Sequence, residues 1–164
     1  KKTKEIVYKT KEEMEFSYRK SILQSGRYIL IHAEFDLKKE PIENINLLIE
    51  RNLEFRKSIQ PNLATPNAGS VFKNPENDSA GRLLDKAGVK SFDEDNVQVW
   101  QKHANFIINK GRATSEDVLE LMVKMKNAVK QQYTIELKPE IIFIGDKTKK
   151  EENLWNMLYQ ESQK

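Results

Sequence analysis

The sequence contains no cysteine and no long hydrophobic run, and each absence removes a class of protein. Without cysteine there is neither a disulfide framework nor a thiol nucleophile, which fits a reducing compartment. The longest unbroken apolar stretches, such as residues 141–144, are far shorter than the roughly 20 residues that span a bilayer. We therefore expect a cytoplasmic protein that is soluble and does not bind a membrane.

Histidine is scarce and the charge is nearly balanced, which argues against two kinds of binding site. The 28 basic and 25 acidic residues leave a formal charge of +3, with no basic block that would mark a nucleic-acid surface. The two histidines show no metal-type spacing with acidic residues, so we predict no metal site. Residues 1–5 lack an initiator Met and the apolar segment of a signal peptide, and we expect a chain cut from something longer.

What is present is enough for a folded core, because 38% of the 164 residues are hydrophobic. Runs rich in β-branched and aromatic residues predict two strands early in the chain, at 6–8 and 28–35. Two strands cannot stand alone in water, so they must pair with later strands or with a sheet outside this chain. Further strand material is expected at 106–108, 135–136 and 141–144.

Hydrophobic periodicity predicts several helices. Apolar residues recur at three- and four-residue steps after Pro41, which predicts a helix of four or five turns. Residues 79–87 indicate a short helix ended by Gly88, and residues 114–129 carry one apolar stripe after a typical helix start. The charged tail after Lys147 has helical spacing as well.

The segment between these elements, residues 60–75, is rich in Pro, Asn, Ala, Gly and Ser and predicts an irregular loop. It places Ser70 directly after Gly69, with Lys73 and Asn74 close behind. Glycine lets a backbone approach a ligand, while a hydroxyl, an ammonium and an amide suit an anionic or phosphorylated one. Gly-Ser and Asn-Pro mark turns more often than sites, and the segment lacks the Gly-Lys-Ser/Thr ending of a P-loop.

Three other side chains could carry chemistry, and each has a simpler interpretation. Arg19 could grip a carboxylate with two parallel hydrogen bonds, but a solvated Arg in a connection explains it equally. His103 precedes an apolar strand, where a lone His is more often a hydrogen-bonded structural residue. Glu140 lies between Pro139 and four apolar residues, and is either partly buried or a strand-end charge that faces water.

Taken together, these pieces resemble one family in order along nearly the whole chain. The four motifs are QPNLATPNAGSVFKNP at 60–75, SAGRLL at 79–84, KHANFIIN at 102–109 and LKPEIIFIG at 137–145. They are similar to the UDP-N-acetylenolpyruvoylglucosamine reductases, also called UDP-N-acetylmuramate dehydrogenases. The sequence differs from the family at 91–100, which is acidic and bulky where a Gly-rich stretch is usual.

The resemblance implies a role for each of three side chains. Ser70 matches the family's catalytic serine, which gives a proton to C2 of the enolpyruvyl group after hydride from the flavin reaches C3. Arg19 matches the arginine that holds the substrate carboxylate, and Glu140 matches the glutamate that works with it. These residue types suit the chemistry, because negative charge develops on C2 and the carboxylate, where a cation and a hydrogen-bond donor lower the barrier.

Three further side chains are expected to bind the substrate, a UDP-sugar. Asn74 matches a substrate-contacting asparagine, Lys73 beside it would reach the nucleotide end, and Tyr18 precedes Arg19 in the matching motif. The implied cofactors are FAD, most of whose site lies outside this chain, and NADPH as reductant. No cofactor-binding residue is assigned, because the family's flavin phosphate loop has no counterpart here.

The implied fold is α+β: a substrate-binding domain with a mixed or antiparallel sheet and flanking helices, preceded by a remnant of the FAD-binding domain. We assign residues 1–59 to the end of the FAD-binding domain, 60–147 to the substrate-binding domain and 148–164 to a terminal helical tail. With an incomplete flavin site, the chain alone is expected to be inactive. We expect the full-length protein to be a monomer.

Three interpretations are compatible with these observations. The first is the C-terminal part of a flavoenzyme that reduces UDP-N-acetylglucosamine enolpyruvate to UDP-N-acetylmuramate in peptidoglycan precursor synthesis, and so serves cell-wall biogenesis, cell shape and division. The second is a non-catalytic module of the same fold that holds a nucleotide sugar. A structural α+β domain with an unrelated loop is the third and simplest interpretation.

Overall fold

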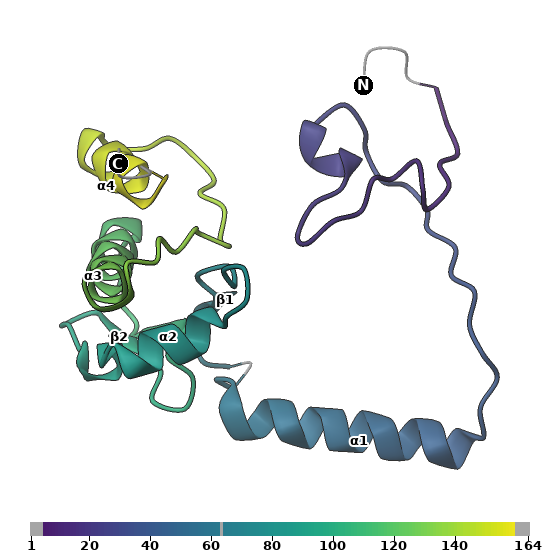
Figure 1. Cartoon of the computed structure of the whole chain (residues 1–164), viewed down its shortest axis with the longest axis horizontal. Coiled ribbons are helices and arrows are strands. Elements are labelled where there is room, and N and C mark those ends of the chain that lie inside the picture. Colours follow the sequence, from purple (N-terminus) through teal and green to yellow (C-terminus); the bar gives the residue numbers. More distant parts are fainter. Residues whose placement is uncertain (1–4, 63, 160–164) are drawn as a thin grey trace. The chain divides into compact units, whose positions relative to one another are not determined.

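The computed structural model describes residues 5–62 and 64–159, and the chain divides into two compact units, Lys1–Ile42 and Glu43–Lys164. Figure 1 labels helices α1 to α4 and strands β1 and β2. Most of the regular structure belongs to the second unit, which also contains the hydrophobic core.

The first unit contains little regular structure among its described residues, 5–42. Its one helical turn, η1 (Ile22–Ser25), is held by a capping box between Ser21 and Gln24. The prediction of strands at 6–8 and 28–35 is wrong, because neither segment pairs with another strand in the part of the chain that is described. Their side chains are accordingly exposed, with Ile31 at 76%. High β-propensity does not make a strand where no ladder partner is at hand.

The helix expected after Pro41 is confirmed as α1 (Ile42–Ile59). No residue of this helix is buried. Its C-terminal end is nevertheless attached to the rest of the second unit, because the indole nitrogen of Trp100 donates a hydrogen bond to the carbonyl oxygen of Ile59 at 3.1 Å. Trp100, the last residue of the bulky segment 91–100, thus has a structural use.

The sheet of the second unit has three strands in the order β1-β3-β2, and both pairings are antiparallel. The strands are β1 (Asn67–Ser70), β2 (Val97–Val99) and β3 (Phe106–Asn109). The strand expected at 106–108 is therefore confirmed, and an antiparallel sheet with flanking helices makes the fold α+β, as expected.

Two strands lie where the sequence did not predict them, and two predicted strands do not form. β1 falls inside the expected loop at 60–75, and β2 inside the acidic, bulky segment at 91–100. Both owe their geometry to β3, which supplies hydrogen bonds on its two edges. Residues 135–136 and 141–144 are not strands; near them the structure has only an isolated bridge between Phe72 and Pro139.

Three more helices follow their predicted positions closely: α2 (Ala80–Lys86), α3 (Ser115–Tyr133) and α4 (Lys149–Tyr159). A short helical turn that the sequence did not predict, η2 (Val89–Ser91), follows α2. Ser79 caps α2, and Thr114 forms a capping box with Asp117 at the start of α3. That box holds the pKa of Asp117 below its usual value, mainly through the Thr114 backbone N–H. No helix in the described part of the chain is both long and apolar enough to cross a membrane.

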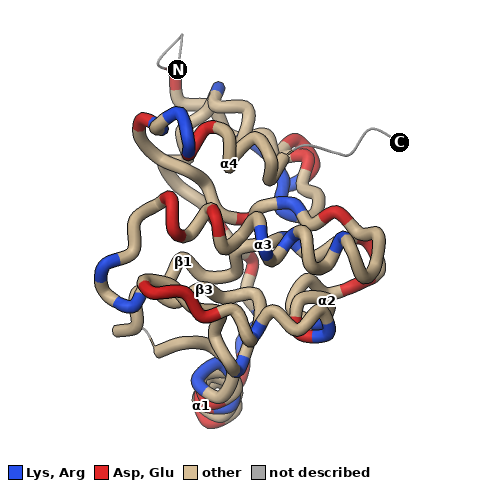
Figure 2. Tube along the Cα trace, turned by 90° about the vertical axis from the view of Figure 1, so that its left-hand side faces the viewer, with Lys and Arg blue, Asp and Glu red and all other residues tan. Residues whose placement is uncertain are grey.

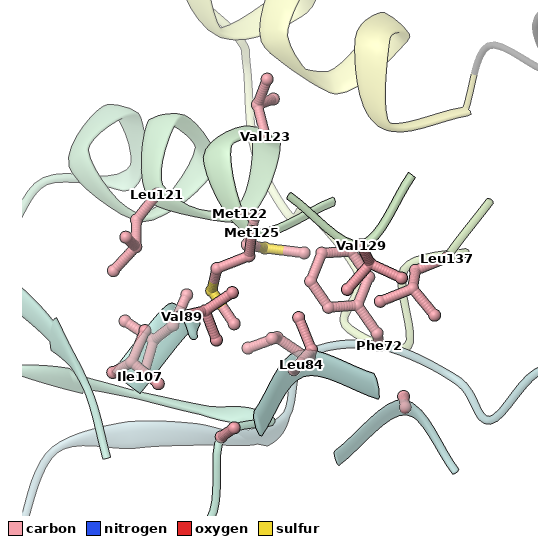
Figure 3. Packing of buried hydrophobic residues seen from close by; sticks show 14 of the residues in the cluster. Phe72, Leu84, Val89, Ile107, Leu121, Met122, Val123, Met125, Val129 and Leu137 are labelled. Atoms are coloured by element: carbon pink, nitrogen blue, oxygen red, sulfur yellow. The ribbon is translucent and has the colours of Figure 1, made fainter. Parts of the chain in front are cut away.

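The core forms where α3 packs on the sheet and α2. The apolar stripe predicted for α3 is buried, and Figure 3 shows Met122, Met125 and Val129 directed toward Phe72 and Leu84. All of these side chains are at most 1% exposed. Charge follows the helix dipole, since α3 begins with Glu116 and Asp117 and carries its lysines further along (Figure 2).

Helix α4 is attached to α3 by a buried lysine. The ammonium of Lys126, whose residue is only 5% exposed, donates to the carbonyl oxygens of Met157 and Leu158, each at 3.0 Å. These carbonyls lie at the end of α4, where helices leave such groups unsatisfied. The same ammonium lies 3.2 Å from a carboxylate oxygen of Glu136. One side chain therefore joins two helices and the segment between them.

We predict that Lys126→Met lowers the free energy of unfolding by about 1.5–3 kcal/mol, because hydrogen bonds from a buried cation are lost while the apolar stem is kept. Denaturant unfolding followed by tryptophan fluorescence measures the change, since Trp155 lies on α4. Lys124→Met is the matched control: its exposed ammonium pairs with Glu94, and its loss should cost less than about 1 kcal/mol. Equal losses for both variants would contradict this account of α4.

Candidate functional site

Ser70 is the last residue of β1 and is partly exposed. The residue before it, Gly69, has a φ of +76°, which L side chains rarely adopt, and no described atom lies within 4 Å of where its Cβ would stand. The side-chain oxygen of Asn67 accepts the Gly69 N–H at 2.9 Å and stabilises this turn of the backbone. Glycine is thus favoured here by its backbone conformation rather than by crowding.

The backbone that follows Ser70 is held on one side by residues 138–140. The N–H of Glu140 donates to the carbonyl of Val71 at 2.9 Å, and the N–H of Lys73 donates to the carbonyl of Lys138 at 2.9 Å. These bonds flank the bridge between Phe72 and Pro139. The structure therefore brings Glu140 beside Val71, the residue directly after Ser70, although 70 and 140 are far apart in sequence.

The same backbone is held on its other side by Asn105. The carbonyl of Asn105 accepts the Val71 N–H at 2.9 Å, and its side-chain amide bonds to both the N–H and the carbonyl of Phe72, at 2.9 and 2.8 Å. The sequence does not predict that Asn105, within the motif at 102–109, is a hydrogen-bond partner of Phe72. An amide just before an apolar strand was the available signal, because a buried amide needs hydrogen-bond partners.

Lys73 and Asn74 follow at the exit from this segment. Lys73 lies across the ladder from Lys138, so the side chains of two lysines start from neighbouring backbone positions. Two positive charges of this kind suit an anionic ligand. The side-chain oxygen of Asn74 accepts the N–H of Ala80 at 3.0 Å and so satisfies one of the free donors at the start of α2. Asn74 therefore orders α2, and its residue is exposed.

His103 has the structural position that its simpler interpretation predicted. Its Nδ1 accepts the N–H of Asn105 at 3.2 Å, and its ring meets Phe106 edge-on at 5.0 Å between centroids. A Cβ added at Gly81 would lie 2.8 Å from the ring carbon Cε1, so the glycine of the SAGRLL motif makes room for this histidine. Burial lowers the pKa of His103, which favours the neutral ring that can accept at Nδ1.

Arg19 and Tyr18 belong to the first unit, whereas Ser70, Lys73, Asn74 and Glu140 belong to the second. Tyr18 and Arg19 form the tip of a tight turn, which is closed by two backbone hydrogen bonds between Ser17 and Lys20, each 3.0 Å long. Arg19 has a φ of +58°, an uncommon conformation for a residue with a side chain. Its guanidinium carbon lies 5.7 Å from the centre of the Tyr18 ring. The two side chains thus form a local pair.

The described residues offer no group of three or more His, Cys, Asp or Glu side chains that could hold a metal ion. The side chains that start from Ser70 and from the backbone beside it are instead a hydroxyl, the ammonium groups of Lys73 and Lys138, and the carboxylate of Glu140. Such a set can bind an anion and transfer a proton.

Comparison with known proteins gives a consistent result. The family model for the C-terminal domain of UDP-N-acetylenolpyruvoylglucosamine reductase matches residues 60–144. A UDP-N-acetylenolpyruvoylglucosamine reductase of Bacillus licheniformis is 41% identical over 143 residues, which cover 87% of this chain and 77% of the relative. One of Bacillus velezensis is 40% identical over 141 residues, 85% of this chain but 46% of the relative.

A solved structure agrees with these relatives. The crystal structure of UDP-N-acetylenolpyruvylglucosamine reductase from Thermus caldophilus superposes with a TM-score of 0.62 at 38% identity, over 77% of this chain and 44% of that protein. The chain thus spans less than half the length of that reductase and of the one from Bacillus velezensis. The resemblance inferred from the four motifs is confirmed, and the chain belongs to the UDP-N-acetylenolpyruvoylglucosamine reductase family, with the family's C-terminal domain in residues 60–144.

Proposed function

We propose that this chain is the substrate-binding, C-terminal part of an NADPH-dependent flavoenzyme that reduces UDP-N-acetylglucosamine enolpyruvate to UDP-N-acetylmuramate. The reaction would serve peptidoglycan precursor synthesis in the cytoplasm, and the full-length enzyme would be a monomer. The observation that carries the proposal is the hydrogen bond between the Glu140 N–H and the Val71 carbonyl. It holds the proposed proton donor, Ser70, and the proposed glutamate of the site on adjoining backbone.

We propose the domain limits on the same basis. Residues 1–59 would be the end of the FAD-binding domain, 60–147 the substrate-binding domain and 148–164 a helical tail. The family match from residue 60 to 144 supports the middle domain. Helix α4 supports a tail as far as Tyr159, and residues 160–164 lie outside the described part of the chain.

The described residues do not by themselves fit FAD. A dinucleotide pyrophosphate is usually bound by a glycine-rich turn at a helix N-terminus. Gly26 is the only glycine before Gly69, and it ends the short turn η1. We therefore propose that most of the flavin site lies outside this chain and that the chain alone is inactive. The tasks left to its own residues are to bind the substrate and to deliver a proton.

The proposed chemistry assigns a task to each side chain. In the reduction, C3 of the enolpyruvyl group gains a hydride and C2 gains a proton, which would come from the Ser70 hydroxyl. Arg19 would hold the substrate carboxylate in a two-pronged hydrogen bond, with Tyr18 beside it and Glu140 completing the site. Lys73 and Asn74 would contact the nucleotide end, where phosphates carry negative charge.

The direct test is isothermal titration of the 164-residue chain with UDP-N-acetylglucosamine enolpyruvate. We expect saturable binding that weakens with added salt, because phosphate charge is part of what is recognised. Lys73→Ala should reduce affinity about tenfold or more through the loss of a charge-assisted hydrogen bond. Lys149→Ala, an exposed lysine at the start of α4, is the control and should bind as the unchanged chain does. An absence of binding by the unchanged chain would refute the proposal.

Turnover can be tested in a chimaera that joins this chain to the part of a longer relative that it does not cover. We predict that Ser70→Ala reduces turnover roughly 10²- to 10⁴-fold, the usual worth of a general acid. Substrate affinity should be kept, because a hydroxyl that acts late contributes little to the ground state. Ser58→Ala, which removes an exposed hydroxyl bonded to the Phe55 carbonyl on α1, should leave turnover unchanged. Near-normal turnover in Ser70→Ala would rule out the proton-donor role.

The same chimaera tests whether Arg19 and Glu140 act on one carboxylate. Arg19→Lys keeps the charge but loses the planar fork, so turnover should fall. Glu140→Gln keeps a hydrogen-bonding group and should be milder than Glu140→Ala. A double-mutant cycle on turnover with Arg19→Lys and Glu140→Ala should give losses that do not add. Additive losses would mean that the two side chains serve different sites.

A further inference from the structure

Asn105 is a polar side chain buried among apolar ones, at 3% exposure. Its side-chain oxygen accepts the Phe72 N–H at 2.9 Å, and its side-chain nitrogen donates to the Phe72 carbonyl at 2.8 Å. Phe72 is itself only 1% exposed. A single amide therefore satisfies both polar groups of a buried residue, as a neighbouring strand would otherwise do.

The position of this amide in the sheet is what links it to the candidate site. Ser70 pairs with Phe106 in the β1–β3 ladder, and Asn105 is the residue just before Phe106. Beyond Ser70 the hydrogen bonds between the two segments continue. The Asn105 carbonyl accepts the Val71 N–H, and the Asn105 side chain then bonds to Phe72. The opposite edge of the same segment bonds to Glu140.

The backbone of Asn105 is held as well. Its N–H donates to Nδ1 of His103 at 3.2 Å, and that ring is packed against Gly81. The charged groups that act on the ring are Lys90 and Asp85. The amide thus projects from a turn that is held by a hydrogen bond and by ring packing.

We propose that Asn105 is a positioning residue: by holding the Phe72 peptide, it sets the position of the adjoining Lys73, and of Glu140 across the ladder, on which substrate binding depends. It acts through the backbone, since it is buried and its amide is already bonded to Phe72. The inference rests on the function proposed above. It requires an amide in particular, because Phe72 presents one donor and one acceptor.

Asn105→Asp tests this requirement with almost no change of shape. An ionised carboxylate can accept from the Phe72 N–H but cannot donate to the Phe72 carbonyl, which it would repel. A protonated carboxyl offers one donor and one acceptor and can restore both bonds. Burial raises the pKa of a carboxyl, so the new group should take up its proton at mildly acidic pH.

The experiment is titration of the 164-residue chain with UDP-N-acetylglucosamine enolpyruvate from pH 8 down to about pH 5, where a buried carboxyl gains its proton. We expect Asn105→Asp to bind about tenfold or more weakly than the unchanged chain at pH 8 and to regain affinity as the pH falls. Asn109→Asp is the matched control on the same strand, because the oxygen of Asn109 accepts from Gly111 and Ala113. The ratio of the affinity of Asn109→Asp to that of the unchanged chain should stay near one across this pH range.

Two outcomes would overturn the proposal: unchanged affinity of Asn105→Asp at pH 8, or a loss that acidification does not reverse. If Asn105→Asp is unfolded at pH 8 by circular dichroism, Asn105→Gln replaces it. That variant keeps the amide one methylene out of place and should bind weakly at every pH, so normal binding would overturn the proposal too.

Amide hydrogen exchange separates this inference from the proposed function, because it needs no ligand. In Asn105→Asp at pH 8 we expect the Lys73 and Glu140 amides to exchange at least tenfold faster than in the unchanged chain, and Asn109→Asp to leave them unchanged. If the unchanged chain does not bind the nucleotide sugar, the proposed function fails. Unchanged exchange of the Glu140 amide would then show that Asn105 does not position the segment either.

Discussion

The structure of the second unit depends on one constraint: the backbone of Val71 and Phe72 is buried, and buried peptide groups must be hydrogen-bonded. The partners come from two distant parts of the chain, Asn105 on one side and Glu140 on the other. Meeting this constraint draws the motifs at 102–109 and 137–145 to the motif at 60–75. The candidate site is a consequence, since Ser70 comes directly before the constrained residues.

Two other buried polar side chains, Lys126 and Glu151, follow the same rule in the outer parts of the unit. Lys126 satisfies carbonyls at the end of α4. Glu151, 6% exposed, accepts the Thr148 N–H at the start of that helix and also pairs with the Ser115 hydroxyl. These bonds keep the pKa of Glu151 below its usual value, the Ser115 hydroxyl most strongly. Helix α4 is thus attached to α3 at both of its ends.

Motifs that suggest ligand contacts also have structural uses here. The amide of Asn74 orders the start of α2, and Gly81 makes room for His103, which in turn holds Asn105. Trp100, in the bulky segment 91–100, bonds to the end of α1. Residues of these kinds serve the scaffold around Ser70, and this explains why four separate motifs accompany a single proposed proton donor.

The sequence by itself determined the helices, the family and the residue types of the candidate site. Helices α1 to α4 were predictable because their apolar spacing and their capping residues, such as Thr114, are local. Only the tertiary structure decided the strands and the site geometry. β1 and β2 exist because β3 lies between them, 6–8 and 28–35 lack such a partner among the described residues, and Glu140 reaches Val71 through a hydrogen bond. Strand pairing joins residues distant in sequence, so no local pattern encodes it.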